Sequence, residues 1–418
     1  MKKQGQCPLL PPSTGPGLGQ IFRDLGGSFL ETENLTNQQK RVFHHIGECR
    51  TAAMGGTAWQ CQECGHWVGA YHSCRDRHCP QCQGKKTADW VDQRTRELLP
   101  VPYFHVVFTL PHRFNHLVSE NPKDCLSLLF QAASKTLLTF AHDPKYLGAT
   151  PGIIMVLHTW GQKLNLHYHV HCIVTAGGLT DQKDRWLDAP RPAWLFPVKA
   201  LAAVFRGKYL EGLNDLYREG LITFSGRDIS TPVKWGSFKR WLAKPKKWNV
   251  YAKAPVAGVE NLVKYLARYA YRIAFHNSRI LSYQDGRVTF RYKDYREKGR
   301  KGYQRRVLTL PVDEFARCFL RHVLPHRFMR IRYYGLLASR NKKKNLAHCR
   351  RILTLMGRMP EPNLSGEQDL IDSDQKAAVE SDEAEFICPY CRKGMMEPML
   401  RMQSKHQKRA RCLLWDTS

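Results

Sequence analysis

The pattern of hydrophobic and polar positions predicts a mixed fold of strands and helices. Three segments rich in β-branched and aromatic residues are typical of buried strands, namely 101–111, 153–160 and 167–176. Apolar residues recur at helical spacing over 122–142 and 198–219. The order of these elements predicts an α+β fold, an antiparallel sheet with helices packed on one face.

The rest of the chain divides by composition. A helix is predicted over 259–275, strands over 280–283, 288–292 and 305–310, and helical structure over 312–340. We expect four parts along the chain: a flexible arm rich in Gly and Pro over 1–33, a Cys- and His-rich domain over 34–100, a main domain over 101–345, and a tail with acidic and basic stretches over 346–418.

Charge indicates the class of partner. The 418-residue chain carries 65 Lys and Arg against 36 Asp and Glu, a formal net charge of +29. Such a surplus attracts polyanions and favours nucleic acid as a partner. The chain shows neither the apolar segment of a signal peptide nor an apolar run that could span a membrane, so we expect a soluble cytoplasmic protein with no membrane partner. In that compartment the 14 cysteines favour metal sites over disulfides.

Cysteine spacing predicts structural zinc near the start of the chain. Cys61 and Cys64 form one Cys-x2-Cys pair, and Cys79 and Cys82 form another after fourteen intervening residues. This spacing is typical of a tetrahedral zinc site whose metal replaces a missing core. We therefore predict that these four thiols bind one zinc ion, and that 34–100 is a zinc-binding, DNA-recognition domain.

Other cysteines leave alternatives open. The same block holds two further pairs at a spacing of four residues: His45 with Cys49, and Cys74 with His78. A second zinc held by these four is one hypothesis, and ordinary buried thiols are the other. In the tail, Cys388 and Cys391 would complete a small zinc site if His406 and Cys412 joined them, which the sequence does not decide.

Three histidines alternate along the strand 167–176. Side chains on a strand point to opposite faces in turn, so His167, His169 and His171 project together. Three imidazoles inside an apolar strand would repel one another when charged, and a bound metal resolves that conflict. Ligand preference alone favours zinc, which makes a zinc hydrolase the main rival interpretation. No HExxH motif and no acidic residue near this strand support that rival.

Two tyrosines share one face of the predicted helix 259–275. Tyr265 and Tyr269 stand four residues apart, beside Arg268 and Arg272. A phenol is a poor nucleophile unless cations or a metal favour its phenolate, and these arginines supply positive charge. The alternative is a pair of half-buried aromatic residues on an amphipathic helix.

A basic, aromatic stretch precedes this helix. Between residues 231 and 254, aromatic rings that can stack on unpaired bases alternate with lysines that can follow a phosphate backbone. The DNA-binding candidates in this stretch are Trp241, Lys246, Lys247 and Trp248, with Tyr251 as a further ring; Arg268 and Arg272 add to them.

Taken in this order, these features resemble the two-tyrosine HUH transposases of bacterial insertion sequences, the insertion-sequence-ninety-one group. The matching stretches are CRTAAMGG, SCRDRHCPQCQ, LLPVPYFHVVFTLPH, HTWGQKLNLHYHVHCIVTAGG, VKYLARYAYRIAFHNSRI and FLRHVLPHRFMRIRYYG. The resemblance spans about residues 35–340 and implies that 101–345 is an HUH endonuclease domain.

The resemblance also implies roles for individual residues. His169 and His171 match the His-hydrophobe-His motif that holds magnesium or manganese, and Tyr265 and Tyr269 match the two nucleophiles. The third metal ligand stays open among His167, His105 and Gln162. The implied function is cleavage and transfer of single-stranded DNA, at element ends and target, through 5′-phosphotyrosine intermediates. A rolling-circle replication initiator and a non-catalytic zinc DNA-binding protein remain as alternatives.

Overall fold

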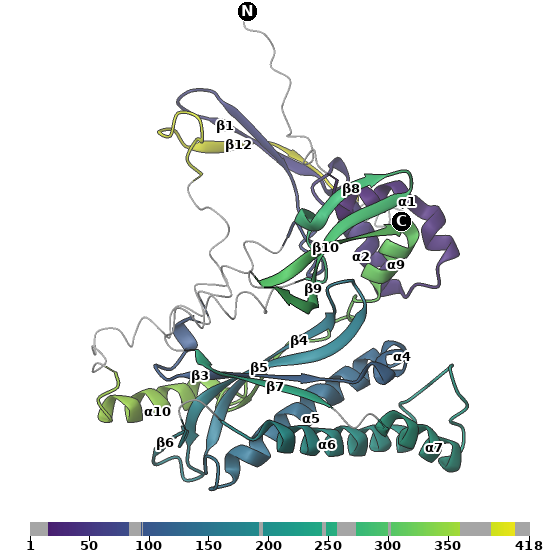
Figure 1. The fold of residues 1–418 in the computed structure, drawn as a ribbon. Coiled ribbons are helices and arrows are strands. Elements are labelled where there is room, and N and C mark those ends of the chain that lie inside the picture. Colours follow the sequence, from purple (N-terminus) through teal and green to yellow (C-terminus); the bar gives the residue numbers. More distant parts are fainter. Residues whose placement is uncertain are drawn as a thin grey trace, which may run out of the picture.

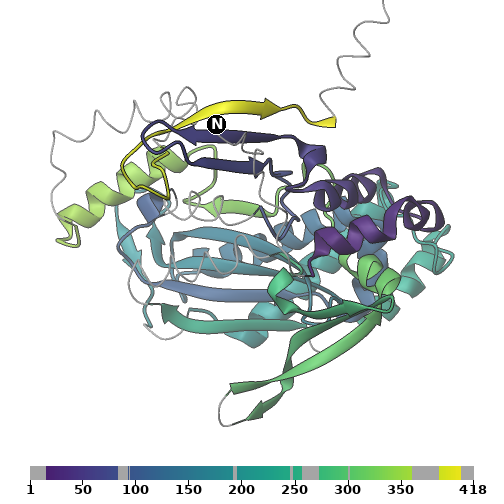
Figure 2. The same ribbon diagram turned by 90° about the horizontal axis from the view of Figure 1, so that it is seen from above.

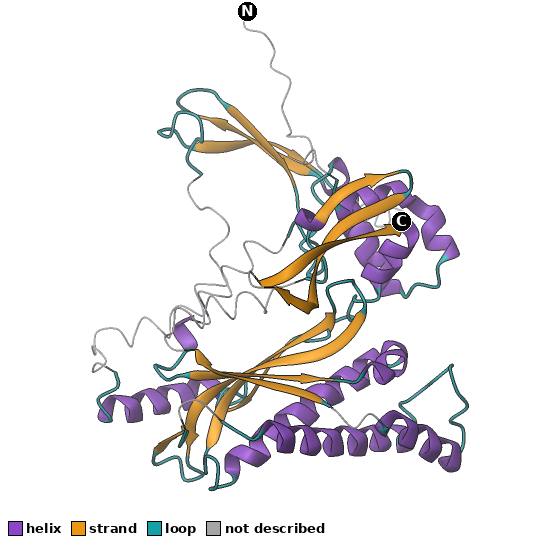
Figure 3. Cartoon of the chain, viewed as in Figure 1, coloured by secondary structure: helices purple, strands orange, loops and turns teal. Residues whose placement is uncertain are grey.

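The computed structural model describes residues 16–82, 93, 95–191, 195–244, 248–256, 273–299, 302–359 and 386–405. Within these residues the chain forms three sheets and the helices that pack on them (Figures 1 and 3). No helix among them is long and apolar enough to cross a membrane.

The central sheet has the strand order β11-β4-β5-β3-β7, with β6 paired to β5, and every neighbouring pair is antiparallel. This confirms the predicted antiparallel sheet. Its strands are β3 (Tyr103–Thr109), β4 (Thr150–Trp160), β5 (Leu166–Leu179), β6 (Trp186–Asp188), β7 (Asn249–Val256) and β11 (Ile331–Gly335).

Helices cover one face of this sheet, as the sequence predicts. Alternate side chains along the strands, such as Phe108 of β3 and Val170 of β5, pack against the apolar sides of the helices and form one continuous core. These helices lie below the sheet in Figure 1. They are α5 (Pro122–His142), α6 (Val198–Arg218) and α7 (Pro232–Ala243), with η2 (His112–Phe114) and α4 (Asn115–Glu120) at the end of β3. A further helix, α10 (Lys342–Leu355), packs on Ile154 and Ile173 of the opposite face.

A second core lies beside the sheet. It combines α1 (Leu18–Thr32) and α2 (Asn37–Glu48) with α9 (Val312–Leu320), the short turns η1 (Ala52–Met54) and η3 (Asn277–Arg279), and the sheet of β8 (Ile280–Gln284), β9 (Arg287–Gly299) and β10 (Gly302–Pro311). Apolar residues of α1, α2 and α9 form much of this core. The rings of Phe22 and Phe43, for example, stack with centroids 4.5 Å apart.

Two sequence-based expectations were wrong in this region. Residues 18–32 do not belong to a flexible arm, because the apolar side of α1 is buried against α2. The pair Gly26 and Gly27 does not end this helix but kinks it, with Gly26 at φ 60°. Residues 312–340 are not one helical segment either. The helix α9 ends at Leu320 and strand β11 follows, with Pro325 between them, and a proline cannot continue a helix.

The third sheet joins the two ends of the chain. Its strands are β1 (Gly56–Cys61), β2 (Trp67–Tyr71) and β12 (Met396–Met402), in the order β12-β1-β2. In Figure 2 the C-terminal strand lies along the N-terminal hairpin. Residues 346–355 and 396–402 therefore do not belong to a separate tail, since α10 packs on the central sheet and β12 pairs with β1.

Candidate metal centre and nucleic-acid interface

The three histidines of β5 project from the face opposite the helices, as predicted. Tyr168 and Val170 point into the helix-covered core, so the alternating His167, His169 and His171 lie on the other face. This face is turned toward β9 and β10 in Figure 1. The turn between β4 and β5 touches that sheet directly.

The third member of the histidine group comes from the neighbouring strand. His158 of β4 pairs across the ladder with His169, and donor nitrogens of His158, His169 and His171 all lie within 4.8 Å of one another. The Nδ1 of His158 is 3.1 Å from the Nε2 of His171. Two imidazole nitrogens bound about 2.1 Å from one ion stand about 3.0–3.4 Å apart, so this pair already has a suitable spacing.

Sequence reasoning missed His158. It sits in the segment IIMVLHTW, in phase with Ile154 and Val156 on the histidine face, and that phase was the available signal. Two of the proposed third ligands are not in the group. The ring centroid of His167 lies 4.8 Å from that of His169 and 5.6 Å from that of the exposed His112, but the close group of ring nitrogens does not include His167. The side-chain oxygen of Gln162 accepts from the backbone N–H of Lys293 at 3.4 Å.

The third candidate, His105, supports the group without belonging to it. Its Nε2 lies 2.9 Å from the Nδ1 of His171, and its side chain is buried. Burial, assisted by Lys253, lowers the pKa of His105 to about 4, so it is neutral at neutral pH. The Nδ1–H of His169 similarly donates to the backbone carbonyl of His167 at 2.8 Å. The rings of His169 and His171 are thus each oriented by a contact at Nδ1.

Replacing His105 with alanine is expected to weaken Mn²⁺ binding about 10–100-fold, because His171 loses the bond that orients its ring. Calorimetric titration of the folded variant with Mn²⁺ measures the change. The matched control is His112→Ala, which removes a neighbouring imidazole that does not contact the group. Unchanged affinity in His105→Ala would show that His105 does not position the ligand.

The tyrosine pair lies outside the described residues, and so do Arg268, Arg272, Lys246 and Lys247. The described chain ends at Val256 of β7, next to Tyr103 on β3, and resumes at Ile273. Ile273 lines a cavity together with Trp160. The ring of Trp160 stacks on the ring of His158 with centroids 4.6 Å apart. The described chain therefore resumes close to the histidine group.

The predicted base-stacking residues behave differently from one another. The prediction that Trp248 stacks on bases was wrong, because this side chain is only 4% exposed and packs against core rings such as Phe205. Trp241 is half-buried, with the guanidinium carbons of Arg113 and Arg227 over its ring at 4.7 and 4.6 Å. Tyr251 is 55% exposed. It alternates with the core residue Val250, so it lies on the histidine face.

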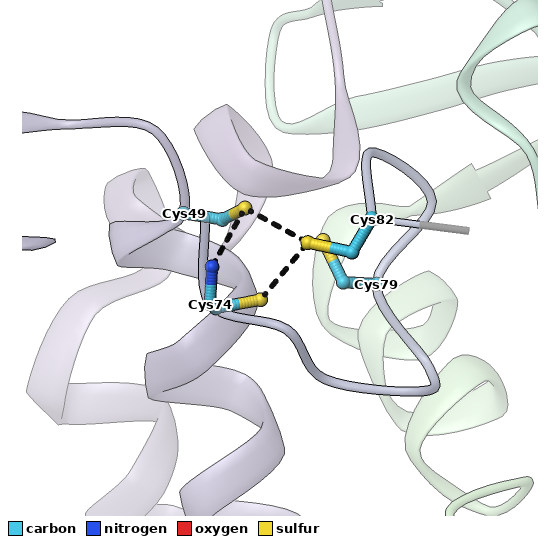
Figure 4. A group of neighbouring side chains, drawn as sticks. All are labelled: Cys49, Cys74, Cys79 and Cys82. Carbon is cyan, nitrogen blue, oxygen red and sulfur yellow. Dashed lines mark hydrogen bonds between the residues drawn. The ribbon is translucent and has the colours of Figure 1, made fainter. Parts of the chain in front are cut away.

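The cysteines form two groups instead of the predicted one. Cys49, Cys74, Cys79 and Cys82 gather at the base of the β1–β2 hairpin (Figure 4). Cys61 and Cys64 lie at the hairpin tip with Cys388 and Cys391. The predicted set Cys61, Cys64, Cys79 and Cys82 was wrong because strand β1 carries the first pair away from the second by six residues, about 20 Å at strand rise.

The first group fits zinc. The Sγ atom of Cys82 lies 3.5 Å from that of Cys49 and 3.6 Å from that of Cys74. Tetrahedral zinc with Zn–S bonds of about 2.3 Å requires S–S edges of about 3.8 Å. Hydrogen bonds from Cys74 lower the pKa of Cys49. Zinc prefers such thiolates as ligands.

The predicted ligands His45 and His78 have another role. Both bind the carboxylate of Asp76, through Nδ1 atoms at 3.2 and 2.9 Å. Burial alone would raise the pKa of Asp76, but the two histidines outweigh it and hold the pKa below its usual range. The second zinc set proposed from the sequence is therefore wrong in both of its histidines and right in pairing Cys49 with Cys74.

The loop 74–82 carries three of the four cysteines of the first group and is called the zinc loop here. Hydrogen bonds connect it to the histidine group. Arg77 donates to the backbone carbonyl of Pro325 at 3.0 Å, and the Nε2 of His78 accepts from the N–H of Leu324 at 3.3 Å. The same 321–328 loop carries His322, whose Nδ1 lies 3.2 Å from the hydroxyl of Thr159. Thr159 follows His158 in the chain. The zinc loop thus supports the strand that presents the third histidine.

Comparison with known proteins gives a consistent result. A family model described as "Putative transposase" matches residues 152–345, and one described as "Transposase zinc-binding domain" matches residues 21–110. The first covers β5 and all but the first two residues of β4, with all three histidines of the group, and the second contains all four cysteines of the first group. The zinc-binding match supports structural zinc at those thiols.

Two curated proteins are similar over most of their length. "Putative transposase y4qJ" of Sinorhizobium fredii is 41% identical, over 92% of this chain and 94% of that protein. "Transposase for insertion sequence element IS801" of Pseudomonas savastanoi pv. phaseolicola is 30% identical, over 74% of this chain and 73% of that protein. No solved structure matches this chain.

Proposed function

Because the chain belongs to the insertion-sequence transposases of the IS91 and IS801 type, we propose that it cleaves and transfers single-stranded DNA through its two tyrosines with the help of a divalent metal. The observation that carries this proposal is the group of His158, His169 and His171 on one face of the central sheet. A purely structural role would not require three imidazoles in mutual contact.

The proposed metal ligands are these three histidines. Their set of donors is all nitrogen, and imidazole suits manganese better than magnesium. We therefore propose Mn²⁺ as the more active ion and Mg²⁺ as the weaker one. When bound, the metal withdraws charge from the scissile phosphate. His105 and the carbonyl of His167 hold the ligand rings in place for this task.

The sequence pattern supports a role for the tyrosines. Tyr265 and Tyr269 stand four residues apart on the predicted helix 259–275, although residues 273–275 of that range are not helical in the structure. The described chain resumes at Ile273, which lines a cavity with Trp160, and the ring of Trp160 stacks on the ring of His158. We therefore propose that the two tyrosines act at the histidine group.

The DNA path is proposed from charge and aromatic residues. Exposed Tyr251 and Lys253 of β7 flank the histidines, and Arg113 and Arg227 lie over Trp241. Rings of this kind stack unpaired bases, and cations beside them hold phosphates. The strongly basic hairpin β9–β10 faces the same side (Figure 1).

In the proposed reaction, a tyrosine hydroxyl loses its proton and its oxygen attacks phosphorus in line. The new O–P bond replaces the bond to the 3′ oxygen, which leaves as an alkoxide and takes up a proton. The 5′-phosphotyrosine conserves the bond energy, so a second 3′-OH can reverse the step onto new DNA without ATP. A second tyrosine allows two strands to be held during the exchange.

A labelled oligonucleotide tests the proposal. The full-length protein is incubated with Mn²⁺ and single-stranded DNA carrying the element's ends, labelled on the 3′ side of the cut. Denaturing electrophoresis should show label on the protein, and duplex of the same sequence should give far less. Cleavage without any adduct would favour a metal-activated water and a hydrolytic nuclease. If neither cleavage nor an adduct is observed, the remaining interpretation is a non-catalytic DNA-binding protein.

A further inference from the structure

We infer that the chain binds a second structural zinc, which fastens the C-terminal strand to the N-terminal hairpin. Its ligands are Cys61, Cys64, Cys388 and Cys391. Two of these four lie outside both matched regions, which end at residue 345. This inference does not depend on the proposed chemistry at the histidines.

The geometry of the four thiols fits one metal ion. The Sγ atoms of Cys61 and Cys391 are 3.7 Å apart, and those of Cys64 and Cys388 are 3.8 Å apart. These distances match the edge of about 3.8 Å in a tetrahedral zinc–thiolate site. All four residues are free cysteines, and Cys61 and Cys388 are buried. A closed set of four thiolates has no open position, so the site is structural.

Both Cys-x2-Cys turns have the backbone of a metal-binding knuckle. The N–H of Cys64 donates to the Sγ of Cys61 at 3.5 Å, and the N–H of Gly394 donates to the Sγ of Cys391 at 3.4 Å. The residue after the second cysteine is left-handed in each turn, Gly65 at φ 69° and Arg392 at φ 56°. For arginine that conformation is unfavourable, so the contacts of the surrounding structure must offset its cost.

Close packing also joins the two turns. A Cβ atom on Gly394 would lie 2.5 Å from the Sγ of Cys61, so only glycine allows the C-terminal turn to approach this closely. The strand that follows pairs with β1 from Cys61↔Met396 to Gly56↔Met402. The two turns are therefore held together both by close packing at Gly394 and by the strand pairing next to them.

The hydrophobic core at this site is too small to hold the sheet by itself. Its buried members are Cys61, Cys388 and Met396, with a few half-buried residues around them. Small units of this kind fold when a metal replaces the missing core. Zinc would thus supply the stability that the three-stranded sheet lacks, and it would close the chain between residues 64 and 388.

Zinc content of the full-length protein tests this inference. Elemental analysis should give one zinc ion per chain fewer for the double variant Cys388→Ser/Cys391→Ser than for the wild type. The matched control Cys318→Ser, a half-buried thiol outside both groups, should keep the wild-type zinc content. A wild-type content below two zinc ions per chain, or an unchanged content in the double variant, would overturn the inference.

A second measurement tests the fastening. A site for a sequence-specific protease is inserted between residues 370 and 375, and the cut protein is passed over a sizing column. The C-terminal fragment should stay with the rest of the wild-type chain and should separate from it in the double variant. Retention of the fragment in the double variant would show that strand pairing alone holds it, and would overturn the role of the metal.

Discussion

Replacing His158 with alanine is expected to lower Mn²⁺-dependent cleavage of single-stranded DNA at least about a hundredfold. Loss of a residue that only orients a ligand typically lowers metal affinity or activity about 10–100-fold. Loss of a direct ligand should lower activity by at least as much. His169→Ala and His171→Ala should have effects of the same size, because each removes one of the three nitrogen donors. Single-turnover cleavage at saturating DNA measures all three variants.

The controls separate metal binding from DNA binding and folding. Affinity for single-stranded DNA should remain near that of the wild type, since phosphate contacts elsewhere on this basic protein dominate it. The matched variant His167→Ala removes a histidine from the same strand that lies outside the group, so it should cleave at nearly the normal rate. If His158→Ala cleaves normally while His167→Ala does not, the third ligand is His167.

The face that carries the histidine group was predictable from the sequence, but the third histidine of the group was not. Alternation along β5 places His169 and His171 together whatever the strand pairs with. His158 joins them only through the register of β4 against β5, and that register shifts between His158 and Trp160. A one-residue slip would turn His158 toward the helices. Local sequence patterns do not determine such a register.

The cysteines illustrate the same limit over a longer range. Each Cys-x2-Cys pair is a local turn, and its existence was readable from the sequence. Which pairs share a metal depends on the hairpin that separates Cys61 from Cys79 and on the pairing of β12 with β1. That pairing connects residues more than 300 positions apart. Spacing alone favoured pairing Cys61 and Cys64 with the next Cys-x2-Cys pair along the chain, Cys79 and Cys82, and that pairing was wrong.

Burial explains the error at Trp248. A basic, aromatic composition indicates a nucleic-acid surface, but it does not say which rings face outward. Trp248 immediately precedes β7 and packs into the core against Phe114 and Tyr209, whereas Tyr251 is exposed. The difference follows from strand alternation, since the two positions are three residues apart. The exposed Tyr251 is the better candidate for base stacking.

Changing both Tyr265 and Tyr269 to phenylalanine is expected to abolish the covalent protein–DNA adduct and strand transfer. Removing the nucleophile of a covalent mechanism typically costs at least about a thousandfold. The double variant loses only two oxygen atoms, so the fold and the affinity for Mn²⁺ should be unchanged. Denaturing electrophoresis with 3′-side label detects the adduct, and calorimetry checks the metal.

The outcome separates a tyrosine mechanism from a metal-activated water. In a hydrolytic nuclease the phenols take no part, so cleavage would persist in the double variant at the wild-type rate. The matched control is Tyr390→Phe, which removes the hydroxyl of a tyrosine that is 75% exposed beside the C-terminal cysteines and should leave the adduct intact. Single changes should retain partial cleavage if either tyrosine can begin the reaction alone. Mass spectrometry of the trapped wild-type adduct then identifies the attacking residue, and attachment outside Tyr265 and Tyr269 would contradict the mechanism.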